Sequence, residues 1–378
     1  MSKWAGKFVI GLTGNIGTGK SAVRRMLEHL GAFGIDADAL AHRTFARGAP
    51  GYQPVIDQFG QWILNEEGEI DRGRLGRIVF SDPKALAILE SIVHPLVERA
   101  IDFLIKRVPQ PVIVIEAIKL LESGLAASCD SIWVVYTPKD IQLARLTQRR
   151  RMSRADALQR IEAQPPQEKK LKVAKVVINN SGSFEETWKQ VVSAWRKTVP
   201  AGIAVSERAE APKVSGKYLI TRGRPGDADK IAELINRVER PPIPLTANDI
   251  MEGFSEKAYL LLHINSSLKA LAGWQVENLV SRTTEMVIDS ELPAEEAIPA
   301  LIQEMEQASK VLQCEVSLVF PPPRLAMMET LWEEMGYTRM VPEALLVRAW
   351  KEAARESMPP GTILLFKKLR EDRVLRPI

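Results

Sequence analysis

Eight consecutive residues near the start of the chain have the types and spacing of a phosphate-binding loop. They are Gly14-Asn15-Ile16-Gly17-Thr18-Gly19-Lys20-Ser21, a full match to the pattern G-x-x-x-x-G-K-S/T. Glycines let such a loop wrap a phosphate with its N–H groups pointing inward, at the positive end of the following helix. Lys20 would reach the β- and γ-phosphates, and the Ser21 hydroxyl would ligate Mg²⁺. The loop therefore predicts a nucleoside triphosphate site that uses ATP and Mg²⁺.

Two carboxylates follow at the end of a short apolar run, in the segment Ile35-Asp36-Ala37-Asp38. Side chains of an extended segment alternate, so Asp36 and Asp38 are expected to point the same way, beside the phosphate loop. One could accept a proton from an attacking hydroxyl while the other orients that hydroxyl or holds metal-bound water. The structural alternative is that Asp38 caps a helix beginning at Ala39. For the pair we favour the catalytic interpretation.

A strongly basic segment runs from Gln142 to Gln164. Arg145 and Arg149 are spaced i, i+4, so they share one face of a helix. An arm of this kind, closing over ATP, would neutralise charge in the transition state and exclude water. A solvated basic face is the alternative for most of these side chains, and we rank Arg149 first, then Arg145 or Arg160. The segment's arginines are Arg145, Arg149, Arg150, Arg151, Arg154 and Arg160.

In their order along the chain, these motifs resemble those of bacterial dephospho-CoA kinases over residues ~7–196. The resemblance implies that ATP donates its γ-phosphoryl group to the ribose 3′-hydroxyl of dephospho-CoA, the last step of coenzyme A synthesis. It also implies that Asp38 is the base with Asp36 in support, that Arg149 is a lid arginine, and that Arg160 and Gln164 occupy lid positions. The segments that carry the resemblance are Ile10–Ser21, Ile35–Ala41, Val93–Leu96, Arg145–Arg149, Arg160–Gln164 and Val177–Gly182.

The chain departs from that family at the end of a central strand. Where the family commonly has Asp-x-Pro-Leu-Leu, this chain has Glu116-Ala117-Ile118-Lys119-Leu120-Leu121. Glu116 keeps the negative charge, but Ile118 and Lys119 would change the wall of the acceptor pocket. We expect an active kinase with altered substrate affinity. Another P-loop kinase acting on a nucleoside or small molecule, or a nucleotide-gated binding protein, remains the alternative.

The elements that must position these residues form an α/β fold. Continuous β-branched runs at 8–13, 112–115, 132–136 and 176–179 predict parallel strands buried on both faces, with helices between them. The expected architecture is a P-loop, adenylate-kinase-like three-layer sheet over residues 1–199. Residues 200–215 lack apolar periodicity and predict a linker.

Residues 216–350 predict a second α/β domain. Strands at 217–222, 258–264, 268–277, 283–288, 315–320 and 345–349, with helices at 227–238, 295–311 and 325–334, resemble the order of GCN5-related N-acetyltransferases. Active members bind pyrophosphate on a Gly-rich turn, whereas this chain has the acidic, glycine-free segment 289–296. We expect acetyl transfer to be lost or weakened, and this domain to bind a protein partner or a CoA-related ligand instead. For the tail 351–378, an added strand or a surface arm would both fit.

The composition sets broad limits. A length of 378 residues, 46% hydrophobic and 26% charged, suits two globular domains. Residues 1–200 hold 29 Lys and Arg against 21 Asp and Glu, a net charge of +8, and the remainder hold 22 against 26. Because no aromatic residues interleave the basic stretches, we expect a nucleotide ligand rather than nucleic acid. The chain has only two cysteines, far apart, and we find neither an export signal nor a membrane-spanning run. These features predict a cytoplasmic protein.

Overall fold

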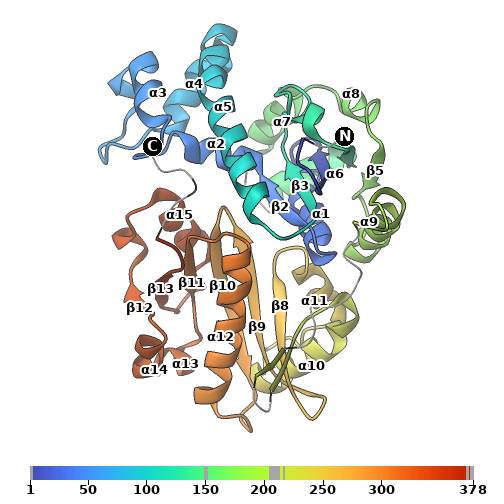
Figure 1. Ribbon diagram of the computed structural model, residues 1–378, viewed down its shortest axis with the longest axis vertical. Helices are drawn as coiled ribbons and strands as arrows, with labels where there is room; N and C mark the ends of the chain where they lie inside the picture. The colour runs from blue at the N-terminus through green and yellow to red at the C-terminus, as the bar shows by residue number, and fades with distance from the viewer. Residues whose placement is uncertain (1–2, 149–151, 204–212, 216–217, 372–373, 375–378) are drawn as a thin grey trace.

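The computed structural model describes residues 3–148, 152–203, 213–215, 218–371 and 374. Its two halves stack along the long axis, the first half at the top of Figure 1 and the second half below it. Each half has its own sheet. The first sheet has the strand order β2-β3-β1-β4-β5, and the second has the order β12-β13-β11-β10-β9-β8-β7-β6. The α/β class predicted for both halves is confirmed.

The first sheet is entirely parallel, so the carboxyl ends of its strands meet at one edge. Every residue of β1 and β3 is buried, which explains their unbroken apolar sequences. The strands are β1 (Phe8–Thr13), β2 (Phe33–Asp36), β3 (Val112–Glu116), β4 (Ser131–Tyr136) and β5 (Val176–Asn179).

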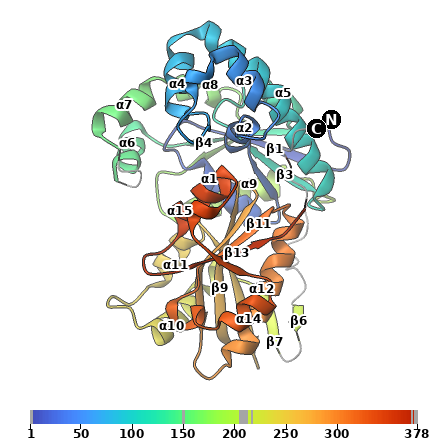
Figure 2. The ribbon, with the colours of Figure 1, turned by 90° about the vertical axis from the view of Figure 1, so that its left-hand side faces the viewer.

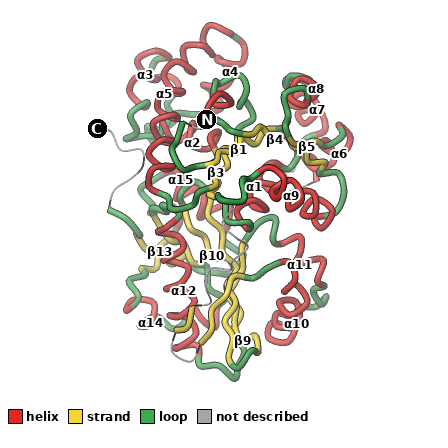
Figure 3. Tube along the Cα trace, turned by 45° about the vertical axis from the view of Figure 1, so that its right-hand side comes forward, coloured by secondary structure: helices red, strands yellow, loops and turns green. Residues whose placement is uncertain are grey.

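Helices cover both faces of this sheet, giving the predicted three layers (Figure 3). On one face Val9 and Ile113 pack with residues of α2 to α5. On the other face Ile10 and Val114 pack with α1 and α9. The helices are α1 (Lys20–His29), α2 (Ala37–Thr44), α3 (Tyr52–Phe59), η1 (Gln61–Ile63), α4 (Arg72–Ser81), α5 (Pro83–Arg107), η2 (Leu125–Ser128), α6 (Lys139–Gln148), α7 (Arg154–Glu162), α8 (Gln167–Leu171) and α9 (Phe184–Thr198).

The second sheet is antiparallel except where β10 and β11 pair in parallel. A register shift between Thr283 and Glu285 bends β10 beside β9. Helix α12 packs on one face and α10 and α11 on the other. The strands are β6 (Lys213–Ser215), β7 (Tyr218–Arg222), β8 (Ala258–Ile264), β9 (Ser267–Glu277), β10 (Val280–Ile288), β11 (Val316–Val319), β12 (Thr338–Met340) and β13 (Leu364–Lys368).

The predicted order of the second half is confirmed as far as β11 and needs correction beyond it. The helices are η3 (Pro225–Asp227), α10 (Ala228–Glu239), α11 (Ala247–Gly253), α12 (Ala294–Val311), α13 (Pro323–Ala326), α14 (Glu329–Glu334), η4 (Pro342–Ala344) and α15 (Arg348–Ser357). The helix predicted over 325–334 is thus two short helices. In the described part of the chain, no helix has the length and apolar character needed to cross a membrane.

The strand predicted at 345–349 is wrong, because α15 begins at Arg348. Its buried residues Trp350, Ala353 and Ala354 follow helical spacing, whereas Leu346 is 94% exposed. The tail instead supplies an added strand, β13, which lies between β11 and β12. At the other end, β6 pairs with β7, so the last residues of the predicted linker belong to the second sheet.

The two halves contact each other through buried groups. Arg43 of α2 forms an ion pair with Glu315, and the side chains are 6% and 1% exposed. Leu279, between β9 and β10, packs in the apolar cluster of the first half. His29 at the end of α1 lies 3.0 Å from the Phe254 carbonyl oxygen. Figure 2 shows α1 and α15 lying where the halves meet.

Candidate active site

The phosphate-binding loop connects β1 to α1, as predicted, and the helix begins at Lys20. Gly19 has φ +87, and a Cβ added there would lie 2.2 Å from Nδ2 of Asn180. That amide donates to the Thr18 carbonyl oxygen at 2.9 Å, so Asn180 fixes the turn of the loop from the end of β5. Only glycine fits this position, because it needs both a left-handed backbone and the absence of a side chain.

Asp36 and Asp38 do not share an extended segment, which corrects the prediction. Asp36 ends β2 and caps α2, its carboxylate accepting the Ala39 N–H at 2.8 Å. The helix begins at Ala37, so Asp38 lies in its first turn. Capping therefore belongs to Asp36 rather than to Asp38. Asp38 Oδ2 instead accepts the backbone N–H of Ile118 at 2.9 Å, which holds its carboxylate against the end of β3.

Glu116 joins the carboxyl end of β3 to the phosphate-binding loop. Its Oε1 accepts the Ser21 hydroxyl at 2.9 Å, and its Oε2 accepts Nε of Arg24 at 2.8 Å. Both Arg24 and Glu116 are nearly fully buried. Asp36 is the residue beside Glu116 in the pairing of β2 with β3. The sheet therefore gathers carboxylates around the serine that was predicted to ligate Mg²⁺.

Burial shapes the acidity of this cluster. Burial, then the negative charge of Glu116, raises the pKa of Asp36 to about 6. Burial also raises the pKa of Asp38, opposed by its bond from Ile118 and by the charge of Lys20. Lys20 is itself buried, with Nζ 3.4 Å from the Asn15 carbonyl oxygen. A higher pKa makes Asp38 a stronger acceptor for a hydroxyl proton than an exposed aspartate would be.

Lys170 is a site residue that sequence reasoning missed. It lies on α8, is 2% exposed, and donates to the Ile118 carbonyl oxygen at 2.9 Å. Burial, then the neighbouring charge of Lys20, lowers its pKa to about 8. Ile118 thus donates to Asp38 and accepts from Lys170, linking the two. In the sequence, Lys170 stands beside Lys169 in a basic helix, and no local pattern distinguishes the buried member of that pair.

The difference from the family's Asp-x-Pro-Leu-Leu pattern at 116–121 affects the candidate site mainly through backbone groups. Lys119 points to the surface, where it lies 3.0 Å from Glu90 in a half-exposed ion pair. The peptide groups of Ile118 face Asp38 and Lys170. A proline at Ile118 could not donate the N–H that Asp38 accepts. This chain therefore gives Asp38 a hydrogen bond that the Asp-x-Pro pattern does not provide.

The segment predicted to be a lid contains α6 and α7, which pack against Ile16 of the phosphate-binding loop. Arg145 of α6 donates to the carbonyl oxygens of Thr18, at 3.3 Å, and Asn180, at 2.7 Å, so it braces the loop. Arg160 is exposed on α7. Arg149 lies outside the described residues, as do Arg150 and Arg151.

The loop after α7 also contacts the phosphate-binding loop. Gln164 Oε1 accepts the Ile16 N–H at 2.8 Å, and Asn15 Nδ2 donates to the Pro165 carbonyl oxygen at 3.0 Å. Ile16 packs with Leu146 and Ile161. Helices α6 and α7 and the residues just after α7 therefore pack against the phosphate-binding loop.

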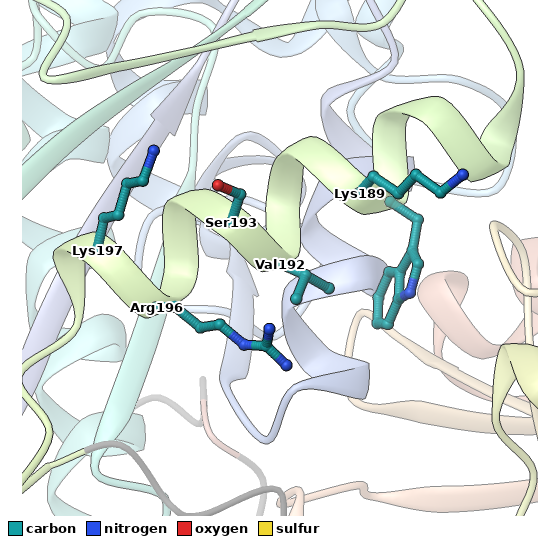
Figure 4. Close-up of a pocket in the computed structure, with 6 residues that line it drawn as sticks. Lys189, Val192, Ser193, Arg196 and Lys197 are labelled. Atoms are coloured by element: carbon teal, nitrogen blue, oxygen red, sulfur yellow. The ribbon is translucent and has the colours of Figure 1, made fainter.

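A pocket of about 420 Å³ lies elsewhere, on α9 (Figure 4). Its lining is basic and comes from that helix alone: Trp188, Lys189, Val192, Ser193, Arg196 and Lys197. None of the phosphate-loop or carboxylate residues lines it. The pocket is therefore separate from the phosphate-binding loop and the carboxylates, which lie at the carboxyl ends of β1, β2 and β3.

Comparison with known proteins identifies the first half. The family model for dephospho-CoA kinase matches residues 8–186. A dephospho-CoA kinase from Carboxydothermus hydrogenoformans is 47% identical over 192 residues, which are 50% of this chain and 93% of that protein. Another from Geobacter metallireducens is 44% identical over 194 residues, 50% of this chain and 96% of that protein. The chain belongs to the dephospho-CoA kinase family.

The dephospho-CoA kinase similarity stops at about half of the chain, and the second half has other neighbours. The crystal structure of the ribosomal-protein-S18-alanine N-acetyltransferase from Escherichia coli is 12% identical, with a TM-score of 0.32. It covers 41% of this chain and 96% of that chain. The second half has its own eight-stranded sheet, outside the residues that match the dephospho-CoA kinase family.

Proposed function

We propose that the first half transfers the γ-phosphoryl group of ATP to the ribose 3′-hydroxyl of dephospho-CoA, giving coenzyme A and ADP. The observation that carries this proposal is Asp38, held by the Ile118 N–H at the carboxyl end of β3, beside the phosphate-binding loop. Its placement suits a base that faces the γ-phosphate. The relatives named above supply the identity of the acceptor.

In this reaction Asp38 accepts the proton of the 3′-hydroxyl as that oxygen attacks the γ-phosphorus. The bond from phosphorus to the β–γ bridging oxygen breaks, and ADP leaves with that electron pair. Lys20 neutralises charge on the transferring group. Lys170, through Ile118, holds the position of Asp38. Among the lid arginines we propose Arg149 for contact with the phosphates and Arg145 for support of the loop.

We also propose Ser21 as a ligand of Mg²⁺. The donor set fits the ion, because the Ser21 hydroxyl oxygen and the Glu116 carboxylate lie 2.9 Å apart in a partly buried place. Magnesium commonly takes one or two protein oxygens and completes its shell with water and substrate phosphates. Within the described residues, no three His, Cys, Asp or Glu side chains gather into a metal site of their own. Bound Mg²⁺ would neutralise phosphate charge during transfer.

The test measures ADP release by the full chain with ATP, Mg²⁺ and a panel of acceptors. We expect turnover with dephospho-CoA and none above background with nucleosides or small alcohols. Turnover with a nucleoside but not with dephospho-CoA would assign the chain to another class of P-loop kinase.

Substitution at Asp38 separates a kinase from a binding switch. Asp38→Asn keeps the size of the side chain and an acceptor for the Ile118 N–H but removes the base. We expect turnover to fall roughly 100-fold or more, while the affinity for ATP stays within about twofold. Unchanged turnover in this variant would contradict the role assigned to Asp38.

For the second half we propose that acetyl transfer is lost or greatly weakened. Asp289 forms ion pairs with Arg237 at 2.8 Å and Lys269 at 3.6 Å, and Lys269 also pairs with Glu291. Asp289 and Glu291 of the acidic segment are thus paired with cations of α10 and β9. Glutamates also occupy the first turn of α12, where a helix attracts anions. Acetylation of any amine from acetyl-CoA at an enzymatic rate would contradict this proposal.

A further inference from the structure

The turn between β9 and β10 contacts both helices that carry the kinase residues. Glu277, the last residue of β9, lies 3.4 Å from Nη2 of Arg25 on α1. The carbonyl oxygen of the next residue, Asn278, accepts Nη1 of Arg43 on α2 at 2.5 Å. Adjacent residues of one turn therefore attach to α1 and to α2.

The contact of the second half with α2 is buried and consists of two hydrogen bonds from Arg43. While Nη1 of Arg43 donates to the turn, Nη2 donates to Oε2 of Glu315 at 2.7 Å. Glu315 is 1% exposed and also accepts Nε1 of Trp350 at 3.1 Å and the N–H of Val374 at 3.3 Å. Water does not compete at such a pair, and the planar guanidinium fixes the direction of both bonds. Arg43 is therefore held in one orientation by the second half.

The turn is also anchored by a side chain in an unfavourable backbone conformation. Asn278 and Leu279 have φ of +53 and +62, the signs of a type I′ turn. Leucine rarely adopts this conformation. Leu279 is nevertheless 7% exposed, because its side chain packs in the apolar cluster of the first half. Burial of this leucine holds the turn against the first half.

These contacts reach the site through short, rigid elements. Helix α1 begins with Lys20 and Ser21, and α2 is capped by Asp36 and carries Asp38 in its first turn. Arg43 lies in the last turn of α2, about 7 to 8 Å along the axis from Asp38. A displacement of α2 at Arg43 therefore displaces Asp38 with it.

We propose that the β9–β10 turn is a positioning element for phosphoryl transfer, and that Arg43 and Glu315 are positioning residues. The second half sets the distance between the base on α2 and the nucleotide on α1. This inference rests on the proposed kinase function. Transfer depends steeply on that distance, so a shift of about 1 Å can lower the rate roughly 100-fold.

The test compares variants of the full chain in steady-state kinetics with ATP, Mg²⁺ and dephospho-CoA. Arg43→Met removes both bonds, and we expect kcat to fall roughly 10- to 100-fold with the KM for ATP within about twofold. Arg43→Lys keeps the charge but cannot make both bonds in the same geometry, so we expect an intermediate kcat. Circular dichroism and thermal melting confirm that each variant is folded at the assay temperature.

Glu352→Gln is the matched control. It weakens a different ion pair between the halves, Arg72 of α4 with Glu352 of α15 at 3.3 Å, and neither helix carries a residue of the kinase site. We expect kcat within about twofold of the wild type.

An inactive wild type would overturn the proposed function itself. An active wild type whose folded Arg43→Met and Arg43→Lys variants keep a normal kcat would overturn only the positioning role, even if their melting temperatures fall. The same conclusion follows if Glu352→Gln lowers kcat as much as Arg43→Met does. If Arg43→Met does not fold, Arg43→Lys decides alone.

Discussion

Asp36 offers a sharp test of the carboxylate cluster, because its charge is expected to destabilise the folded protein. Its carboxylate lies beside Glu116 and Asp38, and burial and Glu116 raise its pKa to about 6 from an ordinary value of 3.8. Asparagine at this position keeps an oxygen that can cap α2, and asparagine is as good a cap as aspartate. Asp36→Asn therefore removes the charge and leaves the cap. We expect the variant to be more stable than the wild type at neutral pH.

The magnitude follows from linkage. An acid whose pKa is raised on folding favours the folded state below the unfolded pKa and loses that advantage as pH rises through the folded pKa. A rise from 3.8 to about 6 corresponds to about 3 kcal/mol at pH 7.5 and about 1.5 kcal/mol at pH 5. The side chain is partly exposed, so these are upper values. For a domain of about 200 residues, the upper value at pH 7.5 corresponds to roughly 6 to 12 °C in melting temperature.

The assay is urea unfolding followed by tryptophan fluorescence at pH 7.5 and pH 5, without nucleotide. Asp71→Asn is the control, since Asp71 caps α4 but lies nearer the surface, and its pKa is lowered by backbone hydrogen bonds. We expect no stabilisation from that variant. An Asp36→Asn protein no more stable than the wild type at pH 7.5, or a gain that does not shrink at pH 5, would refute this account of the cluster.

Three further predictions concern the same site. Burial lowers the pKa of Lys170 to about 8, so we expect kcat of the wild type to fall above pH 8. Because arginine keeps its charge, Lys170→Arg should shift that fall to higher pH in a pH–rate profile. Ile118→Pro removes the N–H whose hydrogen bond lowers the pKa of Asp38, so the acid limb of the kcat/KM profile should move to higher pH. An acid limb that does not move would contradict the role of this hydrogen bond. Gly19→Ala would place a methyl group against Asn180, so we expect this variant to lose ATP binding in an equilibrium titration. The control variant Gly202→Ala, at an open loop position, should bind ATP as the wild type does.

Local sequence was sufficient for the features that depend on neighbours along the chain. The phosphate loop needs glycines at fixed offsets, and the buried strands need unbroken apolar runs, so both were predicted closely. The structure places Lys20, Ser21, Asp38 and Glu116 close together, and the roles assigned to them stay predictions. The prediction was wrong at Leu345–Ala349, where two local signals competed. The apolar run there favours a strand, but the next buried residues have helical spacing and form α15.

The polar groups of the site come together only through packing of distant segments. Lys170 is a site residue only because α8 folds back onto the end of β3, and nothing within its own segment marks it. Arg43 looked like an ordinary helix residue, and its partners Asn278 and Glu315 are 235 and 272 residues away. Periodicity and motif spacing report on a few neighbouring residues, whereas burial and pairing depend on contacts between distant segments. Local motifs thus predict the phosphate chemistry, whereas contacts of the second half with α1 and α2 depend on packing between distant segments.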